Sequence, residues 1–239
     1  MHFISETTSD GVSEQLFMLN DIPGVLWSLA DETGGRPLVL LAHGGGHHKK
    51  APGVLARAHR YVTGCGFAAV AIDAPGHGDR PRTEREDQLQ ADAAELVAAG
   101  KPLGPLFDRY NAELAALAVP EWQATLDALP GYGPVGFWGM SMGSGIGVHV
   151  AAAEPRITAA VFGLAGGEFV TGAAVRVRIP VEFWLQWDDE FIPRESGLAL
   201  FDAFTSRDKV MHANPGRHTE LPRSEPESSQ RFFAHRLSK

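Results

Sequence analysis

Gly139-Met140-Ser141-Met142-Gly143 is the segment of this sequence with the clearest chemical meaning. It lies between a short apolar run, residues 135–138, and a stretch of small residues, 144–153. A sharp strand-to-helix turn strains the serine backbone, and a glycine two residues away on each side leaves room for neighbouring chain segments. Such a turn exposes the hydroxyl group, so the pattern predicts that Ser141 is a nucleophile.

An oxyanion formed beside Ser141 would need hydrogen-bond donors. A helix that begins after the serine points free N–H groups and the positive end of its dipole at that position, so the N–H of Met142 is the first predicted donor. The second is expected from His43-Gly44-Gly45-Gly46, which directly follows the apolar run 38–42. Gly45 is favoured there, with Gly44 as the alternative, because glycines let the backbone approach a substrate oxygen.

A serine nucleophile also needs a histidine as general base and a carboxylate that fixes the tautomer of that histidine. Asp188-Asp189-Glu190 follows the apolar run 181–186. Asp189 is favoured because it lies four residues before Pro193, which can open the next helix. Asp188 is the alternative, and Glu190 is the weakest candidate.

In a chain order of serine, acid and histidine, the base must follow Asp189. His212, His218 and His235 satisfy this order. His218 lies in a glycine-containing loop at an expected strand end and is therefore the predicted base. His212 falls in or beside a strand and His235 in a terminal amphipathic helix, where structural roles are more common.

Short apolar runs alternate with helical stretches over most of the chain. Strands are predicted at residues 38–42, 67–72, 135–138, 157–162, 181–186 and 208–212, and helices at 53–63, 84–98, 107–129, 144–153 and 193–205. Two strands that look antiparallel, 15–19 and 24–29, come first, and a hairpin-like turn at 31–35 follows. The pattern predicts a single α/β domain over residues 1–239, with about eight mostly parallel strands and helices on both faces.

The composition limits the classes of partner. The net charge is −8 and lysine and arginine do not cluster, which argues against nucleic acid and anionic membranes and favours a small-molecule substrate. No apolar run is long enough to span a bilayer and the first residues do not resemble a signal peptide, so a cytoplasmic location is expected. Cys65 is the one cysteine, which excludes an internal disulfide. The oligomeric state stays open between a monomer and a homodimer.

Several other segments could surround the site. Residues 81–120 are charged, with a Gly- and Pro-rich part at 100–105, and form either a mobile flap or a solvated helix pair. The turn that contains Asp73 and His77 is expected to be structural. The aromatic residues predicted as apolar pocket walls are Phe107, Phe169, Trp184, Trp187 and Phe191, with core packing as the alternative for each.

With Ser141, Asp189 and His218 in this order and the His-Gly-Gly-Gly segment upstream, the chain resembles the α/β-hydrolase superfamily from about residue 38 onwards. The likeness is to small dienelactone-hydrolase-like and carboxylesterase-like serine hydrolases. It implies a nucleophilic serine, an oxyanion hole of two N–H groups, ester hydrolysis through an acyl-enzyme and no cofactor. Dienelactone hydrolases proper use cysteine, so Ser141 favours ordinary ester chemistry. Only residues 163–179 separate two predicted strands where many members carry a lid, so no large lid domain is expected.

Other functions fit the same residues. Lactones, thioesters, amides and peptides can be cleaved by the same triad, and a ligand-binding receptor on a hydrolase fold could keep the triad with negligible turnover. A metal site at His43, His47 and His48 is disfavoured because this loop has no clear acidic partner, so no metal is predicted.

Overall fold

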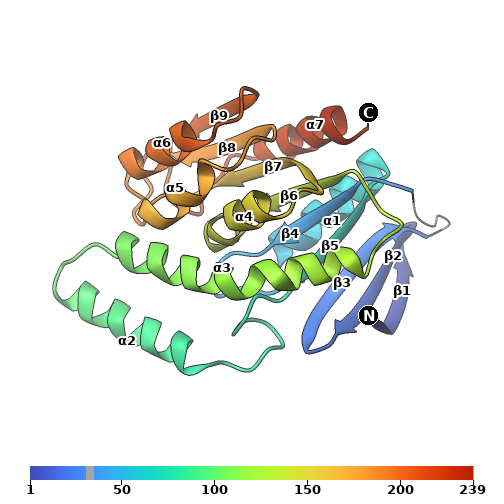
Figure 1. Ribbon diagram of the computed structural model, residues 1–239, viewed down its shortest axis with the longest axis horizontal. Coiled ribbons are helices and arrows are strands. Elements are labelled where there is room, and N and C mark those ends of the chain that lie inside the picture. Colours follow the sequence, from blue (N-terminus) through green and yellow to red (C-terminus); the bar gives the residue numbers. More distant parts are fainter. Residues whose placement is uncertain (31–34, 239) are drawn as a thin grey trace.

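The centre of the protein is a nine-stranded sheet, seen in a computed structural model that describes residues 1–30 and 35–238 (Figure 1). The spatial order is β1-β2-β3-β5-β4-β6-β7-β8-β9. The strands are β1 (His2–Ser9), β2 (Val12–Leu19), β3 (Ile22–Leu29), β4 (Leu38–Ala42), β5 (Ala68–Ile72), β6 (Val135–Gly139), β7 (Ile157–Gly163), β8 (Val181–Gln186) and β9 (Lys209–Asn214).

The sheet has a parallel part and an antiparallel part. Strands β4 to β9 pair in parallel, whereas β1, β2 and β3 form an antiparallel meander that joins β5. This confirms the predicted mostly parallel α/β sheet, with one strand more than expected. The additional strand is β1, whose side chains are all exposed, so its sequence carries no burial pattern.

The hairpin between β2 and β3 turns at Asn20 and Asp21, and Asn20 adopts a positive φ of 55°. The hairpin-like turn predicted at residues 31–35 falls mostly outside the described residues.

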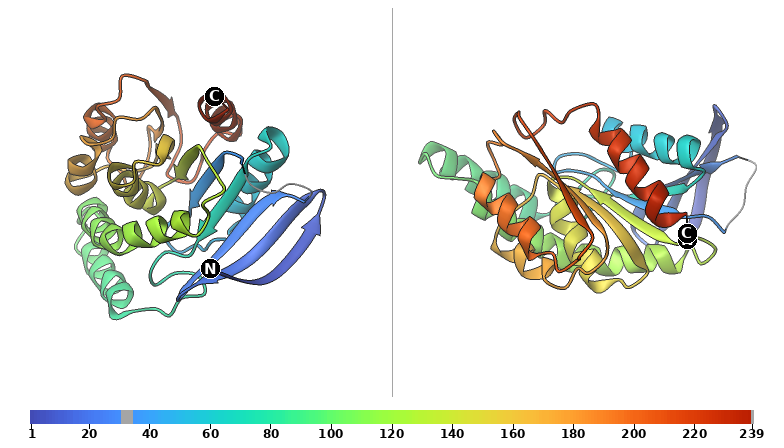
Figure 2. Two further views of the ribbon diagram at one scale, coloured as in Figure 1. Left: turned by 45° about the vertical axis from the view of Figure 1, so that its right-hand side comes forward. Right: turned by 90° about the horizontal axis from the view of Figure 1, so that it is seen from above.

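Helices cover both faces of the sheet (Figures 1 and 2). They are α1 (Pro52–Cys65), α2 (Glu84–Ala98), α3 (Gly104–Asp127), α4 (Met142–Ala153), α5 (Glu168–Ala174), α6 (Arg194–Ala203) and α7 (Glu225–Leu237). Helices α1 and α7 lie side by side on one face, and α3, α4, α5 and α6 cover the other. The short helix α5 was not predicted. It lies between β7 and β8, where many members of the family carry a lid and where no large lid was expected here.

Alternate residues of the parallel strands feed two apolar cores. Leu38 and Leu40 pack in the core under α3 and α4, whereas Val39 and Leu41 pack in the core under α1 and α7. Because successive side chains of a strand point to opposite faces, a strand with both faces covered is apolar throughout. The near-continuous apolar runs in the sequence therefore have a direct structural cause.

The segment 81–120 forms α2 and most of α3, and α2 packs on α3 at the outer end of the helical layer (Figure 1). Thr83 and Glu86 form a capping box at the start of α2, which satisfies its first N–H groups. The Tyr110 hydroxyl donates a hydrogen bond to the Glu86 carboxylate at 3.2 Å and links the two helices. Among the described residues, no helix is both long and apolar enough to cross a bilayer.

Phe162 provides a test of the core. It is fully buried between the rings of Phe137 and Phe204, at centroid distances of 6.0 and 5.9 Å. We expect Phe162→Ala to lower the free energy of unfolding by about 3–5 kcal/mol, because it removes a large side chain and leaves a cavity. Phe169→Ala is the matched control, since Phe169 is 51% exposed and its truncation should change stability by less than about 1 kcal/mol. Equal losses in urea unfolding would contradict this assignment of the core.

Candidate active site

Ser141 lies in the sharp turn between β6 and α4. Its backbone has φ 56° and ψ −122°, a conformation that costs energy for any residue with a side chain. The turn brings α4 so close to the end of β4 that a Cβ atom on Gly143 would lie 2.5 Å from the carbonyl oxygen of Ala42. The Ser141 N–H donates to the Gly163 carbonyl at 3.0 Å. The strained turn is therefore held by the ends of two neighbouring strands.

Ser144 also holds this turn, although the sequence reasoning gave it no role. Its hydroxyl is fully buried and lies 2.6 Å from the Gly139 carbonyl and 2.8 Å from the Gly163 carbonyl. The same oxygen accepts a hydrogen bond from the Gly163 N–H at 2.8 Å. One hydroxyl thus connects the strand before the turn to β7. The available signal in the sequence was a second serine in the first turn of a helix that is rich in small residues.

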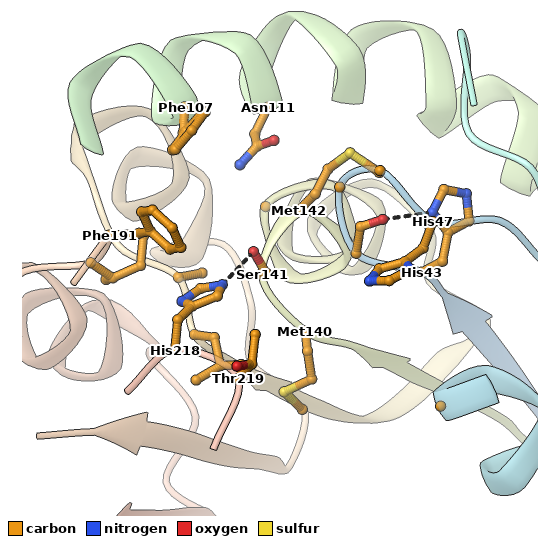
Figure 3. Close-up of a pocket in the computed structure, with 18 of the residues that line it drawn as sticks. His43, His47, Phe107, Asn111, Met140, Ser141, Met142, Phe191, His218 and Thr219 are labelled. Carbon is orange, nitrogen blue, oxygen red and sulfur yellow. Dashed lines mark hydrogen bonds between the residues drawn. The ribbon is translucent and has the colours of Figure 1, made fainter. Parts of the chain in front are cut away.

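A hydrogen-bonded chain leads from Ser141 through His218 to Asp189. His218 Nε2 lies 2.9 Å from Ser141 Oγ, the interaction drawn in Figure 3, and His218 Nδ1 lies 2.7 Å from Asp189 Oδ2. The other carboxylate oxygen of Asp189 accepts hydrogen bonds from the N–H groups of Phe191 and Ile192, both at 2.9 Å. The Asp189 side chain is 3% exposed, so its orientation is fixed by these partners.

The two neighbouring acids hold the loop that carries the histidine. Asp188 accepts a hydrogen bond from the Gly216 N–H at 3.1 Å, and Glu190 accepts one from the His218 N–H at 2.9 Å. The bond from His218 holds the pKa of Glu190 below its ordinary value, and Arg217 adds to the effect. All three acids therefore act on the same loop, but only the Asp189 carboxylate contacts the imidazole.

The His-Gly-Gly-Gly segment follows β4 and lies beside the serine turn. The His43 Nδ1–H group donates to the Gly44 carbonyl at 2.9 Å, and Nε2 accepts from the Ala74 N–H at 3.1 Å. Gly45 lies against the Met142 side chain. Met142 is the first residue of α4, so its N–H has no acceptor within the helix. The segment thus brings Gly44, Gly45 and Met142 to one side of the serine.

A cavity of about 760 Å³ opens in front of the serine. In Figure 3, Phe107 and Asn111 of α3 lie on one side of Ser141, and Met140 and Thr219 lie on the other. Leu89 of α2 also contributes to the lining, so the segment 81–120 covers part of the site. Asn111 and Leu89 were not predicted, because nothing in the sequence tells which helical residues reach the cavity; Thr219, in the turn directly after His218, was not predicted either.

A model of the "Alpha/beta hydrolase family" matches residues 39–237 of the chain. The chain belongs to this family. A comparison with curated proteins gives no match.

Among solved structures, this α/β hydrolase resembles a cold-adapted esterase from an Arctic intertidal metagenomic library in its PEG-bound form, with 35% identity, a TM-score of 0.83 and full coverage of both chains. An acetyl xylan esterase from Paenibacillus sp. R4 has the same fold at 16% identity, with a TM-score of 0.73 and coverage of 99% of this chain and 88% of that one. A dienelactone hydrolase from Anabaena variabilis has 20% identity and a TM-score of 0.64, with 94% and 99% covered.

The aromatic residues predicted as pocket walls of this hydrolase have different positions. Phe107 and Phe191 line the cavity, with ring centroids 6.1 Å apart. Phe169, Trp187 and Trp184 are not among the described residues that line it, which corrects the prediction for them. Phe169 is on the surface, Trp187 packs on the core beside Arg194, and Trp184 is fully buried. An aromatic residue near a strand end has several neighbours to pack against, and the sequence does not tell which.

The remaining histidine and acid candidates are engaged elsewhere. Asp73 is fully buried and accepts hydrogen bonds from the Lys49 N–H and Nζ, both at 2.7 Å, which agrees with the structural role expected for it. The His77 ring lies 5.5 Å from the His43 ring, tilted by 47° to it, and lines the cavity. His235 is exposed on α7.

Glu182, His212 and Glu225 are the one group of described residues close enough together to share a metal ion. His212 Nδ1 lies 2.6 Å from Glu225, and Trp184 Nε1 donates to Glu182 at 2.8 Å. Burial raises the pKa of Glu182. The contact of His212 with Glu225 joins β9 to α7, the 3.0 Å hydrogen bond from Ser228 Oγ to Glu182 joins α7 to β8, and His212 thus has a structural role.

His43 makes the stability of the protein depend on pH. Burial lowers the pKa of His43 to about 4. As the pH falls, the unfolded chain therefore binds a proton at this residue at a higher pH than the folded protein does. The stabilisation is complete above about pH 6.5 and is lost as the pH falls toward 4, by about 2 kcal/mol between pH 7.5 and pH 5. We expect His43→Gln to remove this contribution to the dependence of the free energy of unfolding on pH, which urea unfolding at several pH values measures.

His235→Gln is the control, since His235 is exposed and this variant should keep the wild-type slope. A His43→Gln protein with an unaltered pH dependence would show that His43 is not buried as a neutral group.

Proposed function

We propose that the chain is a serine hydrolase that cleaves carboxylic esters of small molecules through an acyl-enzyme intermediate. The observation that carries the proposal is the continuous chain of hydrogen bonds from Ser141 Oγ through His218 to Asp189, which opens on the cavity. The likeness to a cold-adapted esterase at 35% identity over the full chain supports ester bonds as the target.

In the first half of the reaction, the ester carbonyl carbon is attacked by Ser141 Oγ. His218 Nε2 takes the hydroxyl proton, and the buried Asp189 carboxylate stabilises the imidazolium that forms. The carbonyl electron pair moves to the oxygen, and the N–H groups of Met142 and Gly45 bind that oxyanion, with Gly44 as the alternative to Gly45. Collapse of the intermediate releases the alcohol, which receives its proton from His218.

In the second half, His218 removes a proton from water, and the hydroxide oxygen attacks the acyl carbon. The second tetrahedral intermediate expels Ser141 Oγ, which recovers its proton from His218. The products are the free acid and the unmodified serine. These steps use groups of the chain and water, and they require no cofactor. All of these groups lie just after strands of one sheet, which is consistent with a single domain as the catalytic unit.

Lactones, thioesters and amides present the same carbonyl to the same groups and remain alternative substrates. A receptor that binds its ligand without turnover is the alternative from another class. Such a receptor could keep the triad, so turnover of a generic short-chain ester is the observation that separates it from an enzyme.

We expect the wild-type protein to hydrolyse p-nitrophenyl acetate, butyrate or octanoate, and Ser141→Ala and His218→Ala each to lower kcat by a factor of about 10³ or more. A fluorophosphonate should label the wild-type serine and not Ser141→Ala, as read by intact-protein mass. Ser228→Ala is a control for the removal of a hydroxyl group away from the cavity and should retain turnover. Absence of turnover in the wild type with all three esters would favour the receptor.

The two aspartates allow a matched comparison. Asp189→Asn should lower kcat by a factor of about 10³–10⁴, because the amide favours the wrong tautomer of His218. Asp188→Asn should lower kcat by less than a factor of about 10, because the Asp188 carboxylate accepts a hydrogen bond from the Gly216 N–H rather than from His218. Equal losses in the two variants would contradict the assignment of Asp189 as the triad acid.

A further inference from the structure

Arg57 of α1 lines the same cavity as Ser141. Its guanidinium carbon lies 4.2 Å from the ring centroid of Trp138 and 5.8 Å from that of Trp184. Trp138 is on β6, three residues before Ser141, and packs in the same core as Met140. Figure 3 shows Met140 on the side of Ser141 opposite Phe107 and Asn111. Arg57 therefore lies on the Met140 side of the nucleophile.

Arg57 lacks the acidic partner that a half-buried cation ordinarily has. Among the described residues its guanidinium makes one hydrogen bond, from Nη1 to the Gly53 carbonyl at 3.0 Å, and no ion pair. Nε is buried and has no acceptor. Burial lowers the pKa of Arg57, and the positive charge of Arg60 lowers it further, whereas Tyr61 acts in the opposite direction. An arginine nevertheless stays charged in proteins, so an uncompensated positive charge remains beside the cavity.

Trp138 adds a second unused donor at the same place. The side chain lines the cavity and is only 5% exposed, and its indole Nε1–H has no acceptor among the described residues. Buried donors without acceptors are uncommon, because each one loses its hydrogen bonds to water. Two such donors in neighbouring side chains indicate that the acceptor comes from outside the chain.

Asp108, in contrast to Arg57, is a charged residue of the cavity lining that has hydrogen-bond partners within the chain. It is the lining residue of opposite charge, and its carboxylate accepts hydrogen bonds from the N–H groups of Phe169 and Val170, at 2.9 and 3.3 Å. Asp108 is thus occupied by the start of α5. It therefore does not compensate the charge of Arg57, with which it forms no ion pair among the described residues.

The start of α1 increases the positive potential at this place. Ala51, Pro52, Gly53 and Val54 line the cavity, and α1 has no side-chain cap and no acidic residue in its first turn. The helix dipole therefore adds partial positive charge next to the guanidinium.

We propose that Arg57 binds a carboxylate of the substrate, so that the preferred substrates are esters with a free carboxylate on one side of the ester bond. This inference rests on the proposed ester hydrolysis. A guanidinium can donate two parallel hydrogen bonds to a carboxylate, and the low polarity around Trp138 strengthens such a pair. The ester carbonyl then lies at Ser141, and the other half of the substrate lies against the rings of Phe107 and Phe191.

The test compares esters that differ in one terminal group. Mono-p-nitrophenyl adipate is paired with p-nitrophenyl 6-methylheptanoate, in which an isopropyl group replaces the carboxylate, and 3-carboxyphenyl butyrate is paired with 3-isopropylphenyl butyrate. The two pairs place the carboxylate on the acyl side or on the alcohol side. For each pair the ratio of kcat/KM values is measured in the wild type, Arg57→Met and Arg57→Lys.

We expect Arg57→Met to lower the ratio of carboxylate to isopropyl ester by a factor of about 10–100 in one of the two pairs, mainly through KM. Arg57→Lys should restore part of the ratio, since it retains the charge without the planar pair of donors. Arg60→Met removes the same charge from the same helix outside the cavity and should leave the ratios at the wild-type value. Comparison with the wild type cancels the intrinsic reactivity of each ester.

Unchanged ratios in both pairs for Arg57→Met would overturn the inference, even while Ser141-dependent hydrolysis of the isopropyl esters upholds the proposed function. If no ester is hydrolysed, the proposed function fails. Adipate binding, measured by calorimetry, then still tests whether Arg57 binds a carboxylate. Binding to the wild type that is lost in Arg57→Met and weakened in Arg57→Lys supports the site, and binding equal in all three proteins, or absent from the wild type, overturns it. Arg57→Lys remains informative if Arg57→Met does not fold.

Discussion

The contact between the first turn of α4 and the end of β4 is the constraint on which the site depends. Gly143 lies so close to the Ala42 carbonyl that no larger residue fits without movement of the backbone. This contact forces Ser141 into its strained conformation and places the Met142 N–H beside the loop after β4. The nucleophile and the donors that would hold the oxyanion thus follow from one packing requirement.

The other proposed catalytic groups are placed by the register of the parallel strands. Strands β6, β8 and β9 end at the same edge of the sheet, so the loops that carry Ser141, Asp189 and His218 meet there. Each loop is then fixed by hydrogen bonds, such as those that the Gly216 N–H donates to Asp188 and the Gly163 N–H donates to Ser144. These bonds hold the triad without the need for a large lid domain.

The sequence was informative wherever a local pattern has a local cause. The glycines around Ser141, the apolar strands and the order of Asp189 and His218 each reflect a contact within a few residues or a rule of strand topology. Strand β1 was missed because its side chains are all exposed and its pairing is by backbone. Phe169 was misplaced because its exposure depends on how α5 sits against α3. Arg57 and Asn111 were not found, because nothing in a helical sequence says that a polar residue faces a cavity.

The elements that perform chemistry and those that shape the cavity are largely different. The proposed triad lies on loops whose ends are fixed by the sheet, whereas α1 and the α2–α3 segment, which packs at the outside of the helical layer, add further residues to the cavity walls. A substitution on α1 such as one at Arg57 changes the charge that a substrate meets but does not touch the hydrogen bonds of the serine turn. Substrate preference can therefore change with the helices while the catalytic geometry stays the same, which is why the family resemblance predicts the reaction better than the substrate.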